Sequence, residues 1–588
     1  MINTAYYPLL FILSISWRTY YRPSGGAAAA FSYIAMQSAI FSMLQFACSM
    51  TGSEKLRLVL AGGAAVWVFL VHLNSLLLSI TSMTLYESIK VLATGGDFLY
   101  TLEEAGLGIP FMAALVFILS LIFCGGAASM AFMPGINLPA TAVSEVSAYI
   151  SVMCVLFFAV EQILNRNSEN FFSRRNLPMY IELFSTNRDS VTFTIPERID
   201  AGGDKFSAVT APGKPGDVVV IILESFRRDS VDQDLAPDMK ALAEDSPVFP
   251  GYHTDAIYTS LAWNTILMDR PPMTLSDDIR HDRLHGRGSP VFRIFREAGY
   301  RTYVASSANM EWKNFHRRIE GREGLIDSYF CAYREREEER NIIDHRTCER
   351  AVSWIKAHDS SIPLFMVVQM DSSHWTYYSD ENNRLSRPYA GAKVNIAKLR
   401  NPDDIDLLFN RYRNSVRQIN SSVSLIVNAL KEKGTYDRTA LVIVSDHGEG
   451  FSTGMIGHSV MHDEIKRPAF IMRLPGVKKF THEGFMSHMD IFPTLFHHMG
   501  IRGTEGIMKG ISVLDKNRGR KGLLCFHGSL LMADLTFDDY TMFFRIKKRG
   551  RRVTFTPVRS TDRQGKMTCP ADREEWKAAL SGIIENYA

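Results

Sequence analysis

Two apolar stretches of the chain end in side chains that can bind a divalent metal ion. Residues Ala440–Val444 lead into Asp446-His447, and residues Val218–Leu223 lead into Glu224. Carboxylate oxygens and imidazole nitrogens are common ligands of such ions. Ligands that follow the carboxyl ends of two neighbouring parallel strands meet at one edge of a sheet. The sequence therefore predicts a metal site shared by two distant segments.

A hydroxyl side chain between these stretches could be a nucleophile. Thr259 and its neighbour Ser260 lie where a helix is expected to begin, and the N-terminus of a helix favours a bound anion. A free hydroxyl is a poor nucleophile at neutral pH, so one that attacks needs metal coordination or a base. Threonine is also common as a helix cap. The segment alone does not choose between capping and catalysis.

The elements that must hold these residues alternate between apolar strands and helices. Strands are expected at 218–223, 300–306, 364–370 and 440–444, and helices near 291–298, 348–358 and 403–433. This alternation is typical of an α/β domain whose mostly parallel central sheet is covered on both faces. Segments 540–546 and 553–558 flank a basic turn and predict a small antiparallel β-hairpin region. The basic residues from Arg545 to Arg552 either contact anionic lipid headgroups or form a solvated hairpin tip.

The first 164 residues differ in character from the rest. A transmembrane helix needs about 20 apolar residues. Four segments qualify as spans of a multi-span α-helical membrane domain: Ala27–Met50, Leu58–Met83, Ile109–Met133 and Val143–Leu164. The shorter segment Met1–Trp17 is a weaker candidate, and five spans are favoured over four. We expect this membrane domain at 1–164, a linker at 165–216, a catalytic domain at 217–515 and a C-terminal β/α extension at 516–588.

Charge and cysteine content give further limits. The net charge of +3 argues against a dedicated nucleic-acid-binding protein, which would show a strong basic excess. Basic residues beside the spans mildly oppose an outside location of the large domain. Cys331 and Cys348 could close a loop through a disulfide in an oxidising compartment or could both stay unpaired.

The order of the candidate residues resembles the alkaline phosphatase/sulfatase superfamily. The pattern consists of Glu224, then Thr259, then Asp446-His447-Gly448-Glu449, then Gly457-His458. Closest are the membrane-bound phosphoethanolamine transferases and the lipoteichoic acid synthase type. Counted back from Arg270, Thr259 takes the place of the sulfatase cysteine. Leu261-Ala262-Trp263 replaces the Pro-Ser-Arg of the sulfatase signature, so the resemblance argues against sulfatase chemistry.

The resemblance implies a role for each candidate residue. Glu224, Thr259, Asp446 and His447 would bind one divalent metal, Zn or Mn, with Thr259 as the catalytic nucleophile and Ser260 as the alternative. His374 and His458 would bind the substrate phosphate and protonate the departing group. Glu449 would only cap the following turn, and Asp490 would cap a helix.

The resemblance also implies a function. The chain would transfer a phospholipid headgroup, phosphoethanolamine or phosphoglycerol, through a phosphothreonine to an envelope lipid, glycan or protein. The catalytic domain would then lie on the extracytoplasmic side of the cell membrane. A phosphodiesterase or phosphatase of the same fold and a non-catalytic lipid-binding relative are the alternatives.

Overall fold

The computed structural model describes only part of the chain. The described residues are 190–194, 216–274, 288–311, 314–334, 341–391, 402–452, 455–458, 461–504, 507–527, 532–549, 552–562, 567–568 and 575–587. The five predicted spans and most of the predicted linker lie outside them. Among the described residues, no helix is both long enough and apolar enough to cross a membrane.

A six-stranded mixed sheet carries the segments of the predicted site. Its strand order is β10-β7-β2-β6-β4-β5, with β10 antiparallel to β7 and the other neighbours parallel. The strands are β2 (Val218–Leu223), β4 (Arg301–Ser306), β5 (Ser328–Cys331), β6 (Leu364–Met370), β7 (Ala440–Ser445) and β10 (Phe470–Arg473). Every side chain of β2, β6 and β7 is buried, as expected for strands covered on both faces. The predicted parallel strands are confirmed, and β10 makes the sheet mixed.

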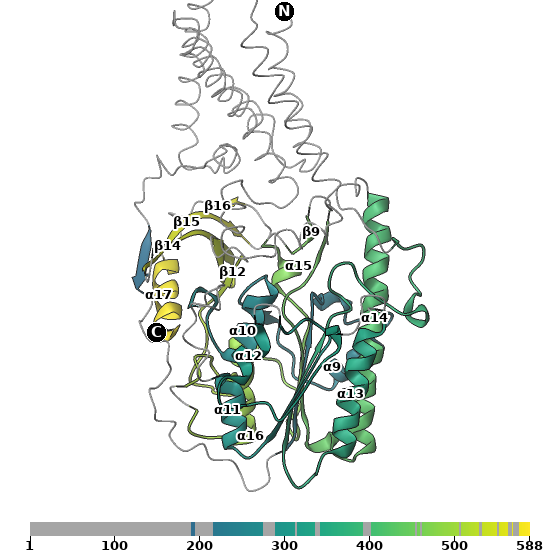
Figure 1. The fold of residues 1–588 in the computed structure, drawn as a ribbon. Coiled ribbons are helices and arrows are strands. Elements are labelled where there is room, and N and C mark those ends of the chain that lie inside the picture. Colours follow the sequence, from purple (N-terminus) through teal and green to yellow (C-terminus); the bar gives the residue numbers. More distant parts are fainter. Residues whose placement is uncertain are drawn as a thin grey trace, which may run out of the picture. The chain divides into compact units, whose positions relative to one another are not determined.

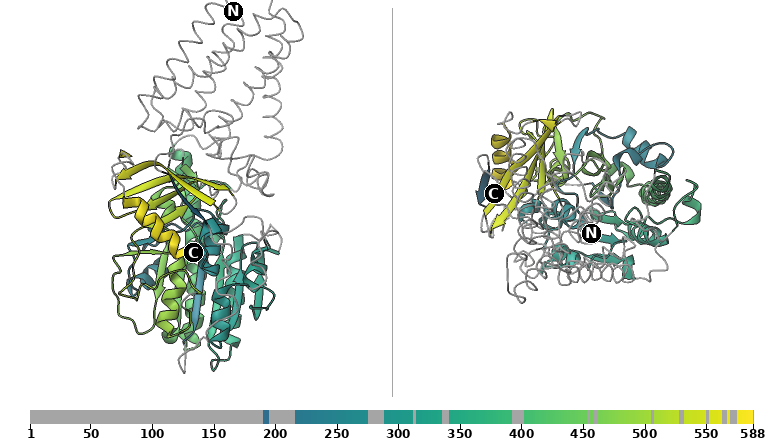
Figure 2. Two further views of the ribbon diagram at one scale, coloured as in Figure 1. Left: turned by 90° about the vertical axis from the view of Figure 1, so that its left-hand side faces the viewer. Right: turned by 90° about the horizontal axis from the view of Figure 1, so that it is seen from above.

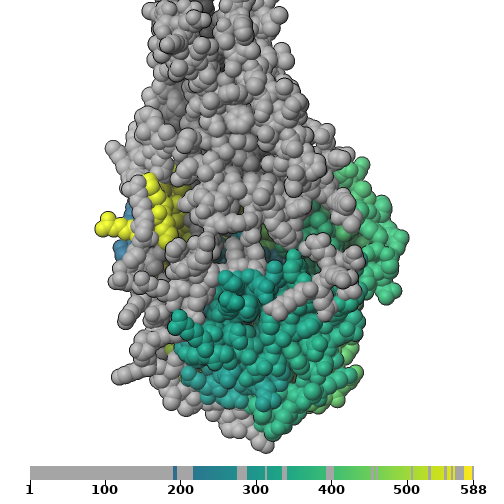
Figure 3. Space-filling model, in the orientation of Figure 1, coloured from purple at the N-terminus to yellow at the C-terminus, as the bar shows by residue number. Residues whose placement is uncertain are grey.

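Helices cover both faces of this sheet (Figure 1). The helices α9, α13 and α14 lie on one face, and α11 and α16 lie on the other. The α-helices described between β2 and residue 500 are α9 (Pro237–Glu244), α10 (Thr259–Met268), α11 (Pro290–Glu297), α12 (Phe315–Glu320), α13 (Ile343–Ala357), α14 (Pro402–Glu432), α15 (Asp463–Lys466) and α16 (Ile491–Met499). In the view of Figure 3, residues around 300–350 form the teal surface, and α14 contributes to the green surface beside it.

Local sequence explains how these helices begin and which side they bury. The Ser289 side chain accepts a hydrogen bond from Phe292 N at the start of α11, and Pro290 occupies the first turn. Phe295 of α11 stacks on Phe365 of β6 with ring centroids 3.9 Å apart. Along α14, the residues buried at helical spacing are Leu408, Tyr412, Val416, Ile419, Val423, Ile426 and Leu430.

A second six-stranded sheet, antiparallel throughout, forms most of the C-terminal region. Its order is β1-β15-β14-β13-β12, with β16 also paired to β15. The strands are β1 (Val191–Thr194), β12 (Leu523–Phe526), β13 (Met532–Thr536), β14 (Tyr540–Arg549), β15 (Arg552–Asp562) and β16 (Met567–Thr568). The predicted hairpin is present as β14 and β15, but it is part of a larger sheet than the sequence indicated.

One strand of this C-terminal sheet comes from the segment predicted as a linker. Val191 of β1 pairs with Phe555, and Thr194 pairs with Arg552. Val191 and Phe193 pack against the apolar core between this sheet and α17 (Glu575–Tyr587). Alternating β-branched and aromatic residues give this part of the segment 165–216 a face to bury.

Helix α17 lies against the C-terminal sheet (Figure 2), and the two share an apolar core. Trp576 of α17 is 1% exposed and packs against Phe544, with ring centroids 5.2 Å apart. Leu261 of α10 and Met489 belong to the same buried core. The sheet is thus packed directly against the helix that begins at Thr259.

Two small strand pairings and the cysteines complete the description. Strand β3 (Gly251–His253) pairs with β11 (Phe485–Ser487), and β8 (Gly450–Ser452) pairs with β9 (Met455–Gly457). Cys331 and Cys348 are both buried and unpaired. The open question about a disulfide between them is answered by the unpaired alternative.

Candidate metal and nucleophile site

The carboxyl edge of the central sheet brings the predicted metal ligands together. Leu223 and Ser445 are register partners in the adjacent parallel strands β2 and β7. The next residues, Glu224 and Asp446, therefore leave the sheet at the same level. Glu224, Asp446 and His447 each offer one ligand atom, and these atoms lie within 4.8 Å of one another. All three residues are buried.

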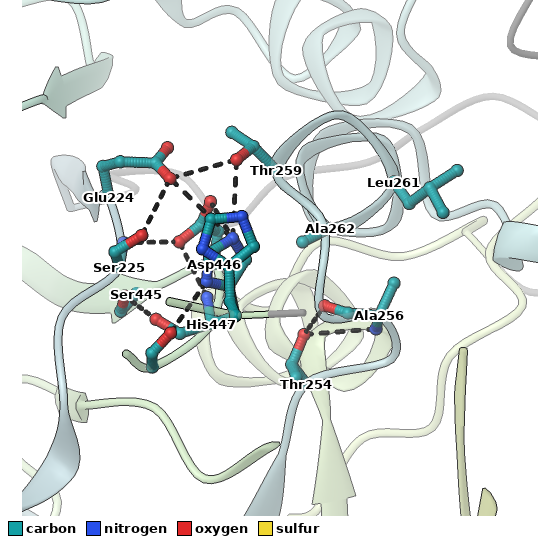
Figure 4. A network of polar contacts seen from close by, with 12 residues as sticks. Glu224, Ser225, Thr254, Ala256, Thr259, Leu261, Ala262, Ser445, Asp446 and His447 are labelled. Carbon is teal, nitrogen blue, oxygen red and sulfur yellow. Dashed lines mark hydrogen bonds and ion pairs between the residues drawn. The ribbon is translucent and has the colours of Figure 1, made fainter. Parts of the chain in front are cut away.

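Thr259 brings its hydroxyl to this group from the first turn of α10 (Figure 4). Thr259 Oγ1 donates a hydrogen bond of 3.0 Å to Glu224 Oε1 and lies 3.4 Å from His447 Nε2. Thr259 is half-buried, whereas Ser260 is 2% exposed. These contacts favour Thr259 over Ser260 as the hydroxyl that belongs to the site.

Backbone contacts fix the direction of the imidazole of His447. His447 Nδ1 lies 2.9 Å from the carbonyl oxygen of Gly448. Because a carbonyl oxygen only accepts, Nδ1 carries the proton, and Nε2 presents its lone pair to the carboxylates. His447 Nε2 lies 3.5 Å from Asp446 Oδ2 and 3.8 Å from Glu224 Oε1. This is the arrangement that a histidine metal ligand requires.

The two oxygens of Asp446 have different surroundings. Oδ1 accepts hydrogen bonds from Ser225 N at 2.9 Å and from His447 N at 2.7 Å. Oδ2 is buried and accepts no hydrogen bond from any group that the structure describes. A buried carboxylate oxygen without a donor is costly unless a cation or a proton satisfies it. Asp446 Oδ2 is therefore free to serve as a metal ligand.

The electrostatics of the group also call for a cation. Burial raises the pKa of the Glu224 carboxyl well above its usual range, and the nearby Asp446 and Asp371 raise it further. Burial also raises the pKa of Asp446. The pKa of His447 is lowered well below its usual range, first by burial and then by His458. Two buried acids beside a neutral imidazole can be ionised together only if positive charge is supplied, as a divalent metal ion would do.

The donor set fits the predicted ion. Two carboxylates, one imidazole and one hydroxyl form a mixed oxygen and nitrogen set that suits Zn²⁺ or Mn²⁺ and does not distinguish them. Glu224, Asp446 and His447 are the residues that would hold the ion, with Thr259 beside them.

His458 lies next to the metal-ligand group. Its ring centroid is 4.2 Å from that of His447, and its Nδ1 is 3.7 Å from Glu449 Oε1. Glu449 accepts a hydrogen bond from Gly450 N at 3.3 Å, which agrees with the predicted turn cap. The same carboxylate lies against His458, a contact that the sequence did not indicate.

His374 reaches the same edge from the neighbouring strand β6. Glu224 N donates a hydrogen bond of 3.1 Å to the carbonyl oxygen of Met370, the last residue of β6. His374 lies in the loop that follows and is half-buried, and its Nδ1 is 2.8 Å from the carbonyl oxygen of Trp375. A positive charge on His374 would lower the pKa of His447, so the two rings lie within electrostatic reach of each other.

Several residues near the site prove structural. Leu261 is part of the core under the C-terminal sheet, and Trp263 packs edge-on against Phe315 at 5.0 Å. The residues that replace the sulfatase signature therefore fill the core. Asp490 accepts a hydrogen bond from Ser487 N in a capping box of the short 3-10 turn His488–Asp490 and forms a bidentate ion pair with Arg520. Its side chain makes no capping hydrogen bond to α16, which begins at the next residue.

Two supporting residues were not recognised from the sequence. Ser225 has a positive φ of 52° and hydrogen-bonds both Asp446 and Glu224. The Ser373 hydroxyl donates to the backbone carbonyl of Glu224. Both adjoin a predicted site residue, but serines at such positions carry no distinctive pattern.

Comparison with known proteins identifies the domain. The sulfatase family model matches residues 216–501. Lipoteichoic acid synthase of Staphylococcus saprophyticus is 27% identical over 130 residues, which cover 21% of this chain and 20% of that protein. Lipoteichoic acid synthase of Staphylococcus aureus is 23% identical over 124 residues, or 20% of this chain and 19% of that protein. Each match thus spans about a fifth of the relative's length.

Two solved structures are similar to part of this chain. The lipoteichoic acid synthase LtaP of Listeria monocytogenes covers 65% of this chain and 95% of its own, with 14% identity and a TM-score of 0.48. The phosphonate monoester hydrolase of Agrobacterium radiobacter covers 63% of this chain and 94% of its own, with 14% identity and a TM-score of 0.47. These similarities concern the fold alone.

Proposed function

We propose, since residues 216–501 of this chain form a sulfatase-family domain, that the protein transfers a phospholipid headgroup to an acceptor of the cell envelope. The headgroup is phosphoethanolamine or phosphoglycerol, and it is carried on Thr259 as a phosphothreonine. The name of the relatives, lipoteichoic acid synthase, favours phosphoglycerol.

One observation carries this proposal. The Thr259 hydroxyl donates to Glu224 and lies 3.4 Å from His447 Nε2, at the start of a helix whose N-cap side chain makes no capping hydrogen bond. The uncapped helix N-terminus favours a bound anion such as a phosphate. A nucleophile, a base and an anion site therefore coincide.

The metal ion held by Glu224, Asp446 and His447 would lower the pKa of the Thr259 hydroxyl and offset negative charge on the phosphoryl group. Glu224 Oε1 already accepts the hydrogen bond of that hydroxyl and can take its proton. Thr259 Oγ1 then forms a bond to phosphorus while the bond from phosphorus to the diacylglycerol oxygen breaks.

Protonation of the departing diacylglycerol completes the first half of the reaction. His374 and His458 border the metal-ligand group and are the residues we assign to this proton transfer and to binding the phosphoryl oxygens. In the second half, an acceptor hydroxyl attacks phosphorus in line, and Thr259 Oγ1 leaves and regains its proton.

The predicted membrane spans would place the catalytic domain next to its lipid substrate. A catalytic domain tethered to the membrane meets lipid headgroups at high local concentration. We therefore propose that the chain is a multi-pass cell-membrane protein with its catalytic domain on the extracytoplasmic side. An envelope lipid, glycan or protein is the acceptor.

The test is diacylglycerol release by detergent-solubilised full-length protein. Phosphatidylglycerol and phosphatidylethanolamine are supplied separately, each with and without glycerol as an acceptor. Release that requires Thr259 but not Ser260, shown by Thr259→Ala and Ser260→Ala, supports the proposal, and the preferred lipid names the headgroup. Release that ignores added glycerol and yields the free phosphorylated headgroup would instead establish a hydrolase. Absence of release from metal-loaded protein would point to a non-catalytic relative.

A further inference from the structure

The short helix α15 is hydrogen-bonded both to the backbone next to His447 and to the backbone that leads to Thr259. The carbonyl oxygen of Ile465 accepts a hydrogen bond of 2.8 Å from Gly448 N, next to His447. The contact is so close that a Cβ added at Gly448 would lie 1.9 Å from the carbonyl oxygen of Glu464. On its other side, the carbonyl oxygen of Lys466 accepts a hydrogen bond of 2.8 Å from Thr254 N. Thr254 begins the segment that leads to Thr259 (Figure 4).

The segment before Thr259 is also joined to the edge of the C-terminal sheet. Ile257 N donates to the carbonyl oxygen of Phe526 at 3.0 Å, and Phe526 N donates to the carbonyl oxygen of Asp255 at 2.9 Å. Phe526 is the last residue of β12. The backbone that carries the proposed nucleophile is therefore held between α15 and a sheet that lies beyond residues 216–501.

A buried ion pair fastens α15 to the same sheet. Lys466 Nζ lies 2.6 Å from Asp534 Oδ2, with side-chain exposures of 3% and 0%. Asp534 on β13 is the register partner of Cys525, the residue before Phe526. Beside the ion pair, Ile257, Ile465 and Cys525 form a small buried apolar cluster. The apolar cluster and the ion pair thus lie together where α15, the segment before Thr259 and the C-terminal sheet meet.

We propose that the Lys466–Asp534 ion pair positions Thr259 relative to Glu224, Asp446 and His447 by holding α15 against the C-terminal sheet. The proposal rests on the proposed role of Thr259 as nucleophile. Lys466 and Asp534 touch no reacting atom, so both are positioning residues. Apolar packing alone would hold the three elements together, whereas a directional ion pair also fixes their register.

The direction of the pKa of Lys466 agrees with a charged pair. Burial alone would lower this pKa, but Asp534 and Asp463 raise it, and the net direction is upward. Removing one partner leaves a buried charge alone and endangers folding, whereas replacing both with apolar residues often keeps stability. A double substitution therefore separates positioning from stability.

The experiment compares full-length wild-type protein with the double variant Lys466→Met/Asp534→Leu. Phosphatidylglycerol and phosphatidylethanolamine are the lipid probes. We expect the rate of adduct formation on Thr259 to fall roughly 10- to 100-fold, because small misplacements of a reacting group have effects of this order. Metal affinity should change less than about threefold, since Glu224, Asp446 and His447 follow β2 and β7 of the central sheet and contact neither Lys466 nor Asp534. Lys466→Arg keeps the ion pair and should stay close to wild type.

Hydrogen exchange of metal-free protein gives a readout that needs no activity. Amide exchange in the segment 254–262 should accelerate about tenfold or more in the double variant, while exchange in β7 stays unchanged. Arg438→Met/Asp217→Asn is the matched double control, because it removes a 2.9 Å ion pair at the opposite edge of the central sheet and leaves an amide oxygen to accept the hydrogen bond from Leu364 N. This control should leave exchange in 254–262 as it is in wild type.

The outcomes separate the two proposals. Wild-type adduct rates and wild-type exchange in the folded double variant would overturn the positioning role. If wild-type protein forms no adduct, the proposed function fails, and exchange in 254–262 still decides whether the ion pair holds this segment. Should the double variant not fold, Asp534→Asn serves in its place and must show slower adduct formation and faster exchange, or the proposal is wrong.

Discussion

The two sheets of the described region contribute to the candidate site in different ways. The central sheet supplies side chains: Glu224 follows β2, and Asp446 and His447 follow β7 in matching register. The C-terminal sheet supplies backbone partners and packing, through Phe526 and through the Lys466–Asp534 ion pair. We infer that the first sheet sets the metal ligands and that the second helps to set the position of the Thr259 hydroxyl. Changes in the two regions should therefore have different signatures.

The largest effect is expected from Glu224→Gln in the central sheet. Turnover should fall by about 10³-fold or more, and bound metal should fall with it, because the variant removes a charged metal ligand and the carboxylate that can take the proton of the Thr259 hydroxyl. Metal analysis and diacylglycerol release measure the two losses. Stability of the metal-free protein should not fall, since a buried carboxyl is replaced by a neutral group of the same shape.

Asp327→Asn, at the start of β5 and far from the carboxyl edge, is the matched control. It should retain metal and turnover. If the Glu224→Gln protein retained its full metal content, the claim that the central sheet supplies the metal ligands would be wrong.

A change in the core of the C-terminal sheet should act on stability first. Trp576→Ala is expected to lower the free energy of unfolding by about 3–5 kcal/mol, as loss of a buried aromatic ring usually does. Amide exchange should accelerate more in the segment 254–262 than in β7. Phe295→Ala, in the core of the central sheet, should show the reverse order. If each variant accelerated exchange equally in 254–262 and in β7, the two cores would not differ in which segment they stabilise.

Sequence reasoning succeeded for the central sheet because its signals are local. The apolar runs of β2, β6 and β7 and the ligands directly after them are adjacent in the chain, and the structure brings Glu224, Asp446 and His447 together as predicted. The C-terminal sheet depends on distant pairings. Thr192 of β1 bonds Thr554, 362 residues away, and Lys466 meets Asp534 across 68 residues. No local pattern reveals such partners, so the extent of this sheet and its link to Thr259 could not be predicted.

Asp255 gives a pH-dependent test of the junction between the two sheets. Burial, with Asp490 nearby, raises the pKa of Asp255 to about 7, although Arg520 opposes this shift. The folded protein then binds more protons than the unfolded chain between pH of about 4 and 7, so the contribution of Asp255 to stability falls as pH rises through this window. The variant Asp255→Asn has no titrating carboxyl at this position, so it does not lose this stability as pH rises.

Chemical denaturation of both proteins between pH 4 and 8 measures the effect. The stability of Asp255→Asn relative to wild type should increase from pH 4 to pH 7 by on the order of 2–3 kcal/mol and then level off. A difference that does not change with pH would show that Asp255 keeps an ordinary pKa and that the junction is more hydrated than its burial indicates.

The smallest effects are expected at the two histidines that border the metal-ligand group. His374→Gln and His458→Gln should each lower turnover by about 10- to 100-fold while metal content stays near that of wild type. His345→Gln, on the exposed side of α13, is the matched control and should have no effect. Loss of metal in either histidine variant would change its assignment from substrate binding to metal binding.

The most direct test of the account is mass spectrometry of the peptide that contains Thr259. Metal-loaded full-length protein is incubated with phosphatidylglycerol or phosphatidylethanolamine and quenched before digestion. The account predicts a phosphoglycerol or phosphoethanolamine adduct on Thr259 that is absent from Thr259→Ala and still present in Ser260→Ala. Diacylglycerol release with no adduct on Thr259, or with the adduct on Ser260, would contradict it.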